Sequence, residues 1–246
     1  MMRGKVRDLE DKTINVVGDK GYSFCNCRNI FFTDWKNILL DIYDDEYSEA
    51  EGGDEGDQAN RIMEVEKQWK VAQRFAPKAK SLLNVGDYED TFLDYLAKTN
   101  FKKMFLTTID LIPRESKHSF IHGNFEMRDF GQEKFDIIWM SHFMEHTKSP
   151  KDALLKAKSL LNPGGIIFNA MPDTHHIDWS NPLAWYWMVQ EHHTLWNMYD
   201  WIDFAEQECG LKCTYGNIST DVISLTGGGT INYWIEEART IFQLAS

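Results

Sequence analysis

Three side chains that could do chemistry lie together in the middle of the sequence, as His142, Glu145 and His146 in the pattern His-x-x-Glu-His. Carboxylate oxygens and neutral imidazole nitrogens bind divalent metals, and an imidazole can also accept a proton near neutral pH. Zinc peptidases carry a similar pattern on a long helix. Here the pattern directly follows a strand predicted over residues 135–141, so the peptidase interpretation is not favoured. The three residues are therefore expected at the end of a strand rather than on a long helix.

A second group of candidate residues lies in the segment 173–197, which holds four of the eight histidines and four of the nine tryptophans. Aromatic rings stack on the apolar faces of sugars and other rings, while neighbouring polar groups bind hydroxyls. The segment is therefore interpreted as a substrate-binding insertion; tryptophans that merely pack in a covering helix are the open alternative. A base that takes the proton of an acceptor hydroxyl is expected to be a histidine. The candidates, in order of preference, are His146, His192 and His175.

The elements that would position these residues alternate between strand and helix from residue 58 onward. Apolar residues at three- and four-residue steps predict helices, over residues 58–76, 91–99, 150–161 and 198–210. Runs that are apolar throughout predict buried strands, over residues 81–86, 103–110, 118–125, 135–141 and 164–172. Buried strands with helices between them are typical of a parallel sheet covered on both faces. With two more strands joined through three glycines at residues 227–229, the predicted fold class is α/β, a doubly wound, mostly parallel seven-stranded sheet with a C-terminal antiparallel hairpin.

The N-terminal part of the chain differs from the rest in composition. Two short β-type runs, at residues 14–17 and 29–32, precede an acidic, glycine-containing stretch over residues 44–57 with almost no apolar side chains. Such a stretch is typical of a solvated linker. We therefore predict a small β-containing extension with an acidic linker over residues 1–57, and a main domain over residues 58–246.

The composition argues against several classes of protein. A formal net charge of −12 does not suit a broad basic surface that grips nucleic acid. No apolar run approaches the roughly 18 residues of a membrane span, and the first residues lack the apolar core of a signal peptide. Four cysteines in 246 residues do not form a disulfide scaffold, so we expect a cytoplasmic protein. Cys25 and Cys27 lack a second pair for a zinc site and are interpreted as ordinary thiols, as are Cys209 and Cys213 in the core.

Residues 81–240 resemble class I S-adenosylmethionine-dependent methyltransferases, most closely over residues 135–172. The matching features are a buried strand, the Glu145-His146 turn, a helix and the entry Pro163-Gly164-Gly165 into the next strand. The resemblance implies a Rossmann-like domain that binds S-adenosylmethionine beyond the carboxyl ends of its parallel strands. It also accounts for the Glu-His pair without any peptidase activity.

The resemblance further implies which residues contact the cofactor. In the family, the loop after the first strand carries three glycines; here Gly86 remains, while Tyr88 and Asp90 stand at the other two glycine positions. An acid after the second strand would accept the ribose hydroxyls, and residues after the third and fourth strands would face the adenine and the methionine part. The implied cofactor contacts are Gly86, Asp87, Tyr88, Asp110, Leu111, Asn124, Phe125, Met140, Ser141 and His142.

Some members of the family, including small-RNA terminal ribose methyltransferases and ubiquinone-pathway catechol methyltransferases, bind a divalent metal through an acid-x-x-Glu-His cluster and a later histidine. The stretch EHHTLWNMYDW over residues 191–201 resembles the later element, an acid-His-x-x-x-Trp pattern. The resemblance implies Glu145, His146 and His192 as metal ligands, with His142 where those enzymes have an acid. Many relatives with a similar Glu-His pair and later histidine bind no metal, so that alternative stays open.

Two functions follow as hypotheses. A weaker resemblance links the N-terminal residues, with Tyr43 and Tyr47 in a Tyr-x-x-x-Tyr loop, to methyltransferases of sugars and glycans. The first hypothesis is an O-methyltransferase that acts on a hydroxyl of a sugar, a glycan or another small acceptor. The second is a methyltransferase-like scaffold or binding subunit, because side chains at positions 88 and 90 fill space that glycines would leave for the cofactor. A nicotinamide-dependent oxidoreductase is not favoured, since Gly86 stands alone and the terminal hairpin does not suit it.

Overall fold

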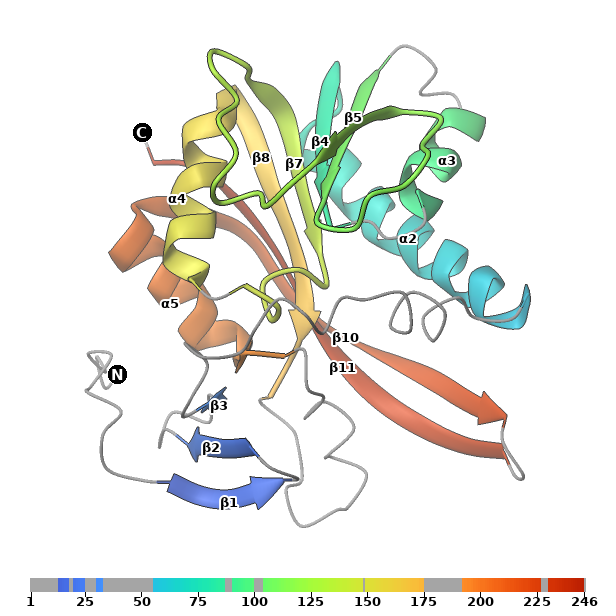
Figure 1. Ribbon diagram of the computed structural model, residues 1–246, viewed down its shortest axis with the longest axis vertical. Coiled ribbons are helices and arrows are strands. Elements are labelled where there is room, and N and C mark those ends of the chain that lie inside the picture. The colour runs from blue at the N-terminus through green and yellow to red at the C-terminus, as the bar shows by residue number, and fades with distance from the viewer. Residues whose placement is uncertain are drawn as a thin grey trace.

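The computed structural model describes residues 13–17, 20–24, 30–32, 55–86, 90–99, 104–147, 149–174, 192–226 and 230–245. These residues form a large sheet of seven strands with helices on both faces, and a small sheet of four strands (Figure 1). The candidate residues that lie outside the described ranges are Cys25, Cys27, Tyr43, Tyr47, Asp87, Tyr88 and His175. No helix within the described ranges is both long enough and apolar enough to cross a membrane.

The large sheet confirms the predicted fold class. Its strands are β4 (Ser81–Val85), β5 (Phe105–Asp110), β6 (Ser119–His122), β7 (Phe135–Ser141), β8 (Leu161–Pro172), β10 (Leu211–Thr226) and β11 (Thr230–Leu244). They are ordered β10-β11-β8-β7-β4-β5-β6. The strands from β8 to β6 are parallel, whereas β11 runs antiparallel to both β8 and β10. Strand order reverses at β4, which lies between β5 and β7, so a ligand is expected beyond the carboxyl ends of these three strands.

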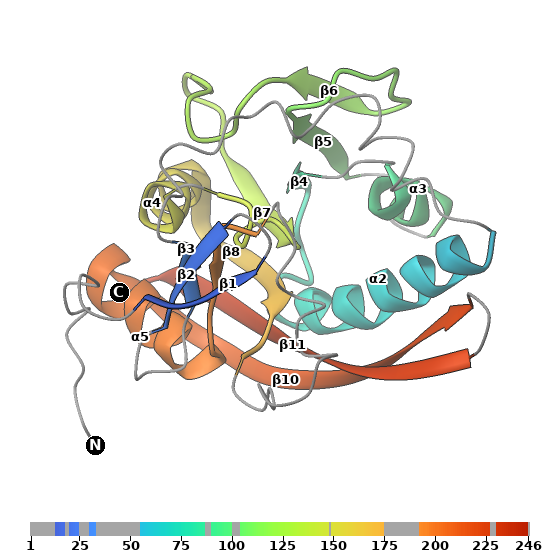
Figure 2. The same ribbon diagram turned by 60° about the horizontal axis from the view of Figure 1, so that its bottom comes forward.

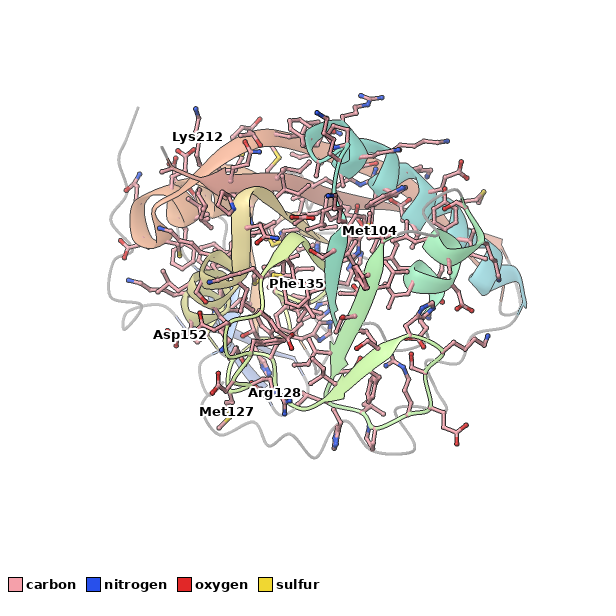
Figure 3. The ribbon with its side chains drawn as sticks, turned by 90° about the horizontal axis from the view of Figure 1, so that it is seen from above. Met104, Met127, Arg128, Phe135, Asp152 and Lys212 are labelled. Atoms are coloured by element: carbon pink, nitrogen blue, oxygen red, sulfur yellow. The ribbon has the colours of Figure 1, made fainter. Side chains whose placement is uncertain are left out.

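Within the part of the chain that the structure describes, four helices cover the large sheet. They are α2 (Glu55–Phe75), α3 (Thr91–Lys98), α4 (Pro150–Leu160) and α5 (Met198–Cys209). The helices α4 and α5 lie on one face and α2 and α3 on the other (Figure 1). Trp139 of β7 is stacked between Phe92 and Phe168, with ring centroids 4.0 Å from each. Seen from above, Phe135 at the start of β7 lies among the packed elements, whereas Asp152 and Lys212 lie at the periphery (Figure 3).

The structure differs from the predicted strand bounds in several places: β5 begins at Phe105, two residues later than predicted, and β8 begins at Leu161, three residues earlier. The strand β6 ends at His122, because Gly123 has φ +147° and Asn124 then begins a turn, in which its Oδ1 accepts a hydrogen bond from the Met127 nitrogen at 3.0 Å. The strands β10 and β11 are longer than the two runs predicted for them, over residues 211–219 and 230–238. Only residues 237–242 of β11 pair with β8, so the remainder of the hairpin projects beyond the sheet (Figure 1).

The small sheet joins the N-terminal residues to a much later segment. It consists of β1 (Thr13–Val17), β2 (Lys20–Phe24), β3 (Ile30–Phe32) and β9 (Thr194–Leu195), paired in that order and antiparallel. It lies beyond the carboxyl end of β8 (Figure 1, Figure 2). Because β9 follows directly after His192 and His193, the N-terminal strands are joined to the segment that carries a candidate site residue. The predicted boundary between residues 57 and 58 stays a prediction.

At the amino ends of the parallel strands, Asp136 of β7 connects the residues at the start of β4 to the start of β8. Its carboxylate accepts hydrogen bonds from the backbone nitrogens of Lys80 and Ser81, at 2.7 and 3.2 Å, and from Nδ2 of Asn162 at 2.8 Å. Burial raises the pKa of Asp136, but these hydrogen bonds outweigh it and hold the pKa below its usual value.

We expect Asp136→Asn to lower the free energy of unfolding by about 1 kcal/mol at neutral pH, because the replacement removes the charge that strengthens three hydrogen bonds. A depressed folded-state pKa contributes stability above the unfolded-state pKa, and this contribution is lost as pH falls through the folded value. Urea unfolding at neutral pH and at about pH 3 measures both effects. If the free energy of unfolding differs between the variant and the unmodified protein by the same amount at both pH values, this account is contradicted.

Candidate active site

Glu145, His146 and His192 form a compact group beyond the end of β7. One potential ligand atom from each residue, a carboxylate oxygen or a ring nitrogen, lies within 4.8 Å of the other two. The rings of His146 and His192 have centroids 4.8 Å apart and cross at 77°. Glu145 is only 1% exposed, His192 is also buried and His146 is half-buried. The structure therefore brings together the three residues predicted as metal ligands.

Backbone hydrogen bonds hold the segment of His192 against the end of β7. The nitrogens of His193 and Thr194 donate to the carbonyl oxygen of Glu145, at 2.6 and 3.3 Å. The nitrogen of His146 donates to the carbonyl of Phe143 at 3.0 Å, which folds the residues after β7 into a turn. Both histidines of the cluster are thus fixed by the main chain around a single residue, Glu145.

One oxygen of the Glu145 carboxylate has a hydrogen-bond partner and the other has none. Its Oε1 is 3.0 Å from Nδ1 of His142, while its Oε2 is buried and has no hydrogen-bond partner. Burial raises the pKa of Glu145, but the hydrogen bond to His142 and the neighbouring imidazoles outweigh it and lower the pKa to about 2. The carboxylate is therefore ionised near neutral pH, with a buried oxygen that lacks a donor.

His146 is neutral near neutral pH. Burial lowers the pKa of His146, and the charge of Glu145 opposes this effect only in part. The nearby imidazoles lower the pKa further, to about 3. A neutral imidazole has a lone pair for a metal ion. As a base it would be weak, because a base works best when its pKa is close to the working pH.

His142 is held between two carboxylates in an uncommon backbone conformation. It has φ +51°, in the left-handed region that side chains other than glycine seldom adopt. Its Nδ1 lies 3.0 Å from Glu145 and its Nε2 lies 3.0 Å from Glu237 of β11. Ionised carboxylates only accept hydrogen bonds, so both ring nitrogens must be protonated. Burial lowers the pKa of His142, but the two carboxylates raise it to about 10. His142 is therefore a cation that orients Glu145, and it does not supply a metal ligand.

A polar network continues from His142 to α2. Gln68 donates from Nε2 to Glu237 at 3.0 Å, and its Oε1 accepts a hydrogen bond from the hydroxyl of Ser141 at 3.1 Å. Arg239 binds Glu237 on one side and Glu64 of α2 on the other. Three elements, α2, β7 and β11, are thus tied together beside the Glu145 group.

The predicted cofactor residues at the ends of β4, β5 and β6 also meet. Gly86 has φ +74°, and its nitrogen donates to the carbonyl of Ile109 at 2.9 Å. The carbonyl of Asp110 accepts a hydrogen bond from the nitrogen of Gly123 at 2.8 Å, just before Asn124. The carboxylate of Asp110 is buried and bound to Arg114 at 3.2 Å. The positions expected to contact the ribose, the adenine and the methionine part therefore lie side by side, at the carboxyl ends of β4, β5 and β6.

Other predicted cofactor residues lie in or beside the hydrophobic core. Phe125 and Met140 are buried, and the Phe125 ring meets the Phe143 ring at 5.9 Å and 88°. Leu111 is half-buried, and its carbonyl oxygen lies 3.0 Å from Nε2 of His122. Contact between these side chains and the cofactor stays a prediction.

A family model described as a methyltransferase domain matches residues 59–214, which is more than half of the chain. The chain belongs to this methyltransferase family. It is an S-adenosylmethionine-dependent enzyme, as the sequence resemblance implied. No curated protein matches the sequence of this methyltransferase.

Solved structures share the fold of the methyltransferase at low sequence identity. A Bacillus halodurans protein described as a methyltransferase aligns with a TM-score of 0.58 at 13% identity, covering 72% of this chain and 97% of that one. An S-adenosylmethionine-dependent methyltransferase from Methanosarcina mazei aligns with a TM-score of 0.52 at 13% identity, covering 72% and 98%. An O-methyltransferase family protein from Burkholderia thailandensis aligns with a TM-score of 0.54 at 12% identity, covering 83% and 61%. At these identities the likeness is one of fold.

Several residues of the methyltransferase site carry no signal in the sequence. Gln68 and Glu237 are 169 positions apart and meet only in the folded chain. Arg114 follows the expected ribose acid by four residues, a spacing that many helices and turns share. Phe143 lies within the best-matched stretch, yet its contact with Gly86 depends on how β4 and β7 are placed side by side.

Gly86 offers a direct test of cofactor binding by the methyltransferase. A Cβ atom at this position would lie 3.2 Å from Cδ2 of Phe143, and the φ of +74° strains any side chain. We expect Gly86→Ala to weaken the affinity for S-adenosylhomocysteine by about tenfold, because the strain of 1–2 kcal/mol distorts the loop. Isothermal titration calorimetry measures the change. Gly131→Ala is the control, because Gly131 also has a positive φ of +58° but lies away from the site. Equal affinities for Gly86→Ala and the unmodified enzyme would contradict the role of this loop.

Proposed function

We propose that this methyltransferase transfers the methyl group of S-adenosylmethionine to a hydroxyl oxygen of a sugar, a glycan or another small acceptor, and that Glu145, His146 and His192 hold a divalent metal beside that hydroxyl. The observation that carries the proposal is Oε2 of Glu145. This oxygen belongs to an ionised carboxylate, is buried, lacks a hydrogen-bond partner and lies beside two imidazoles. Buried charges in proteins are paired or bind metals, so a cation fits the unpaired oxygen.

The set of donors fits a metal better than it fits a lone base. One carboxylate and two imidazoles are three protein ligands, which leave open positions for a substrate oxygen. The lowered pKa of His146 makes this imidazole a poor base but leaves it neutral, as metal binding requires. When bound, a divalent cation would lower the pKa of a coordinated hydroxyl and fix its position.

The residues of the chain have distinct parts in the proposed reaction. The acceptor oxygen forms a bond to the methyl carbon, the bond from that carbon to sulfur breaks, the sulfonium becomes a thioether, and the hydroxyl proton passes to solvent. Glu145, His146 and His192 orient the acceptor, and His142 holds the carboxylate of Glu145 in place. Alignment of this kind can supply most of the rate gain in a displacement reaction.

The acceptor class rests on the segment that leads into His192. Residues 173–197 combine tryptophans with histidines, a composition that suits the stacking of a sugar or aromatic ring. The net charge of −12 does not suit a nucleic acid acceptor. An O-methyltransferase family protein has the same fold, which is compatible with transfer to oxygen.

The test uses S-adenosylmethionine with an isotopically labelled methyl group and a panel of simple glycosides, nucleotide-linked sugars and catechols. Reactions are run with the enzyme as purified, after chelation, and after addition of Mn²⁺, Mg²⁺ or Zn²⁺. Fragmentation mass spectrometry locates the label. We expect a methyl group on oxygen and a loss of activity on chelation that one of the metals restores. Label on nitrogen or carbon, or full activity of the metal-free enzyme, would overturn the proposal.

A further inference from the structure

Two buried carboxylates at the cofactor end of the sheet share a single arginine. Asp90 precedes α3 and is 7% exposed, and Asp110 ends β5 and is 8% exposed. Nη2 of Arg114 lies 2.8 Å from Oδ1 of Asp90, and Nη1 lies 3.2 Å from Oδ2 of Asp110. The arginine side chain is itself only 14% exposed, and its guanidinium carbon lies 5.0 Å from the centroid of the Phe120 ring. One guanidinium therefore bridges the loops that follow β4 and β5.

Asp90 has the backbone conformation of a glycine. Its φ of 56° and ψ of 13° are left-handed, although it is the N-cap residue directly before α3. An aspartate at this position usually caps the helix with its side chain. Here no such hydrogen bond forms, and the carboxylate binds Arg114 instead. In the resemblance described above, Asp90 stands where the family has its third glycine, so the loop keeps a glycine-like turn without the glycine.

Asp110 is fixed by the same arginine and keeps room for a ligand. Its Oδ1 accepts a hydrogen bond from the nitrogen of Ile112 at 2.9 Å, and its Oδ2 accepts one from Arg114. Each carboxylate oxygen has a further lone pair. The two oxygens are therefore held in one orientation and can still accept the two hydroxyls of a ribose.

We infer that Arg114 is a positioning residue for S-adenosylmethionine, which substitutes for the missing glycine by clamping Asp90 in a glycine-like turn and Asp110 in its ribose-binding orientation. Without the guanidinium, two buried carboxylates would stand near each other without a counter-charge. The left-handed backbone of Asp90 would also lack the ion pair that offsets its strain. The inference rests on the family cofactor, and it is independent of the proposed metal and acceptor.

The experiment compares S-adenosylhomocysteine affinity by calorimetry in the full-length enzyme and four variants. We expect Arg114→Gln to weaken binding by about tenfold or more. Arg114→Lys should weaken it less, because an ammonium group keeps the positive charge but lacks the planar fork that spans the two carboxylates. The matched control is Lys117→Gln, which removes a charge whose side chain is 84% exposed, and we expect about unchanged affinity. The decisive variant is the double replacement Arg114→Gln with Asp90→Gly, which should recover most of the lost affinity because glycine adopts the turn without strain.

The outcomes separate positioning from a general structural role. Recovery by Asp90→Gly, with melting temperatures close to that of the unmodified enzyme, supports the inference. Unchanged or tighter binding by Arg114→Gln would overturn it, and so would a loss of affinity that Asp90→Gly does not relieve. If Arg114→Gln does not fold, the same comparison is made with Arg114→Lys alone and combined with Asp90→Gly. Failure of the metal or acceptor proposal leaves these affinities unchanged, so the two tests are distinguishable.

Discussion

Glu145→Gln is expected to lower the rate of methyl transfer by about 100-fold or more while the affinity for S-adenosylhomocysteine stays within about threefold. Glutamine has nearly the same shape as glutamate, so the turn after β7 can persist, but it has no negative charge to offer a cation. The predicted cofactor contacts at Gly86, Asp110 and Asn124 lie on other loops and should be little affected. The rate of methyl transfer should therefore fall while the affinity for S-adenosylhomocysteine stays nearly the same. A general loss of structure would lower both.

Metal content decides between a metal ligand and a residue that only supports the fold. Elemental analysis of the purified enzyme, followed by titration with Mn²⁺ and Zn²⁺, is expected to show one bound ion in the unmodified enzyme and none in Glu145→Gln. The control is Glu133→Gln, because Glu133 is an exposed carboxylate on the loop before β7. An unmodified enzyme that binds neither ion would contradict the metal proposal even if Glu145→Gln were inactive.

The fold was predictable because its central strands are runs of apolar residues that can be recognised in the sequence. The strand predicted over residues 135–141 coincides with β7, and the one over residues 81–86 differs from β4 by a single residue. Parallel strands in the middle of a sheet are apolar on both faces, so their signal is local. The two-residue strand β9 could not be predicted, since it exists only through its pairing with β3, more than 160 positions earlier.

The residues of the candidate site also divide into those that the sequence indicates and those that only the folded chain brings together. Glu145 and His146 were found as a local pair, and His192 was found through a family resemblance rather than through any periodicity. The partners of His142 could not be found, because Glu237 lies 95 positions away and reaches it only when β11 pairs with β8. The sequence also suggested that Asp90 obstructs the cofactor, whereas the structure shows a glycine-like turn at this residue. The volume of a side chain can be judged from the sequence, whereas the left-handed backbone of Asp90 and its ion pair with Arg114, 24 positions later, cannot.

Glu237→Ala is expected to have the largest effect on stability. Glu237 is buried on β11, where it binds His142, Gln68 and Arg239. Truncation leaves the buried Arg239 and the partly exposed His142 without their shared carboxylate. Removal of one partner from a buried ion pair, here that of Glu237 with Arg239, costs about 3–5 kcal/mol. Urea unfolding near pH 6 measures this loss. Glu208→Ala is the control, because the pair of Glu208 with Lys151 is about half exposed and screened by solvent, so its loss should change the stability little.

The pH dependence of this loss shows whether the charges cause it. Burial raises the pKa of Glu237, but His142 and Arg239 outweigh it and lower the pKa, so its contribution is present above the unfolded pKa and is lost as pH falls through the folded value. The raised pKa of His142, about 10, has the opposite sign: its contribution is complete below the unfolded pKa of 6.5 and is lost as pH rises toward 10. The difference in stability between the unmodified enzyme and Glu237→Ala should therefore be greatest between about pH 5 and pH 6.5 and shrink on both sides. A difference that does not vary with pH would mean that Glu237 stabilises β11 through packing alone, and the cationic state of His142 would then need another origin.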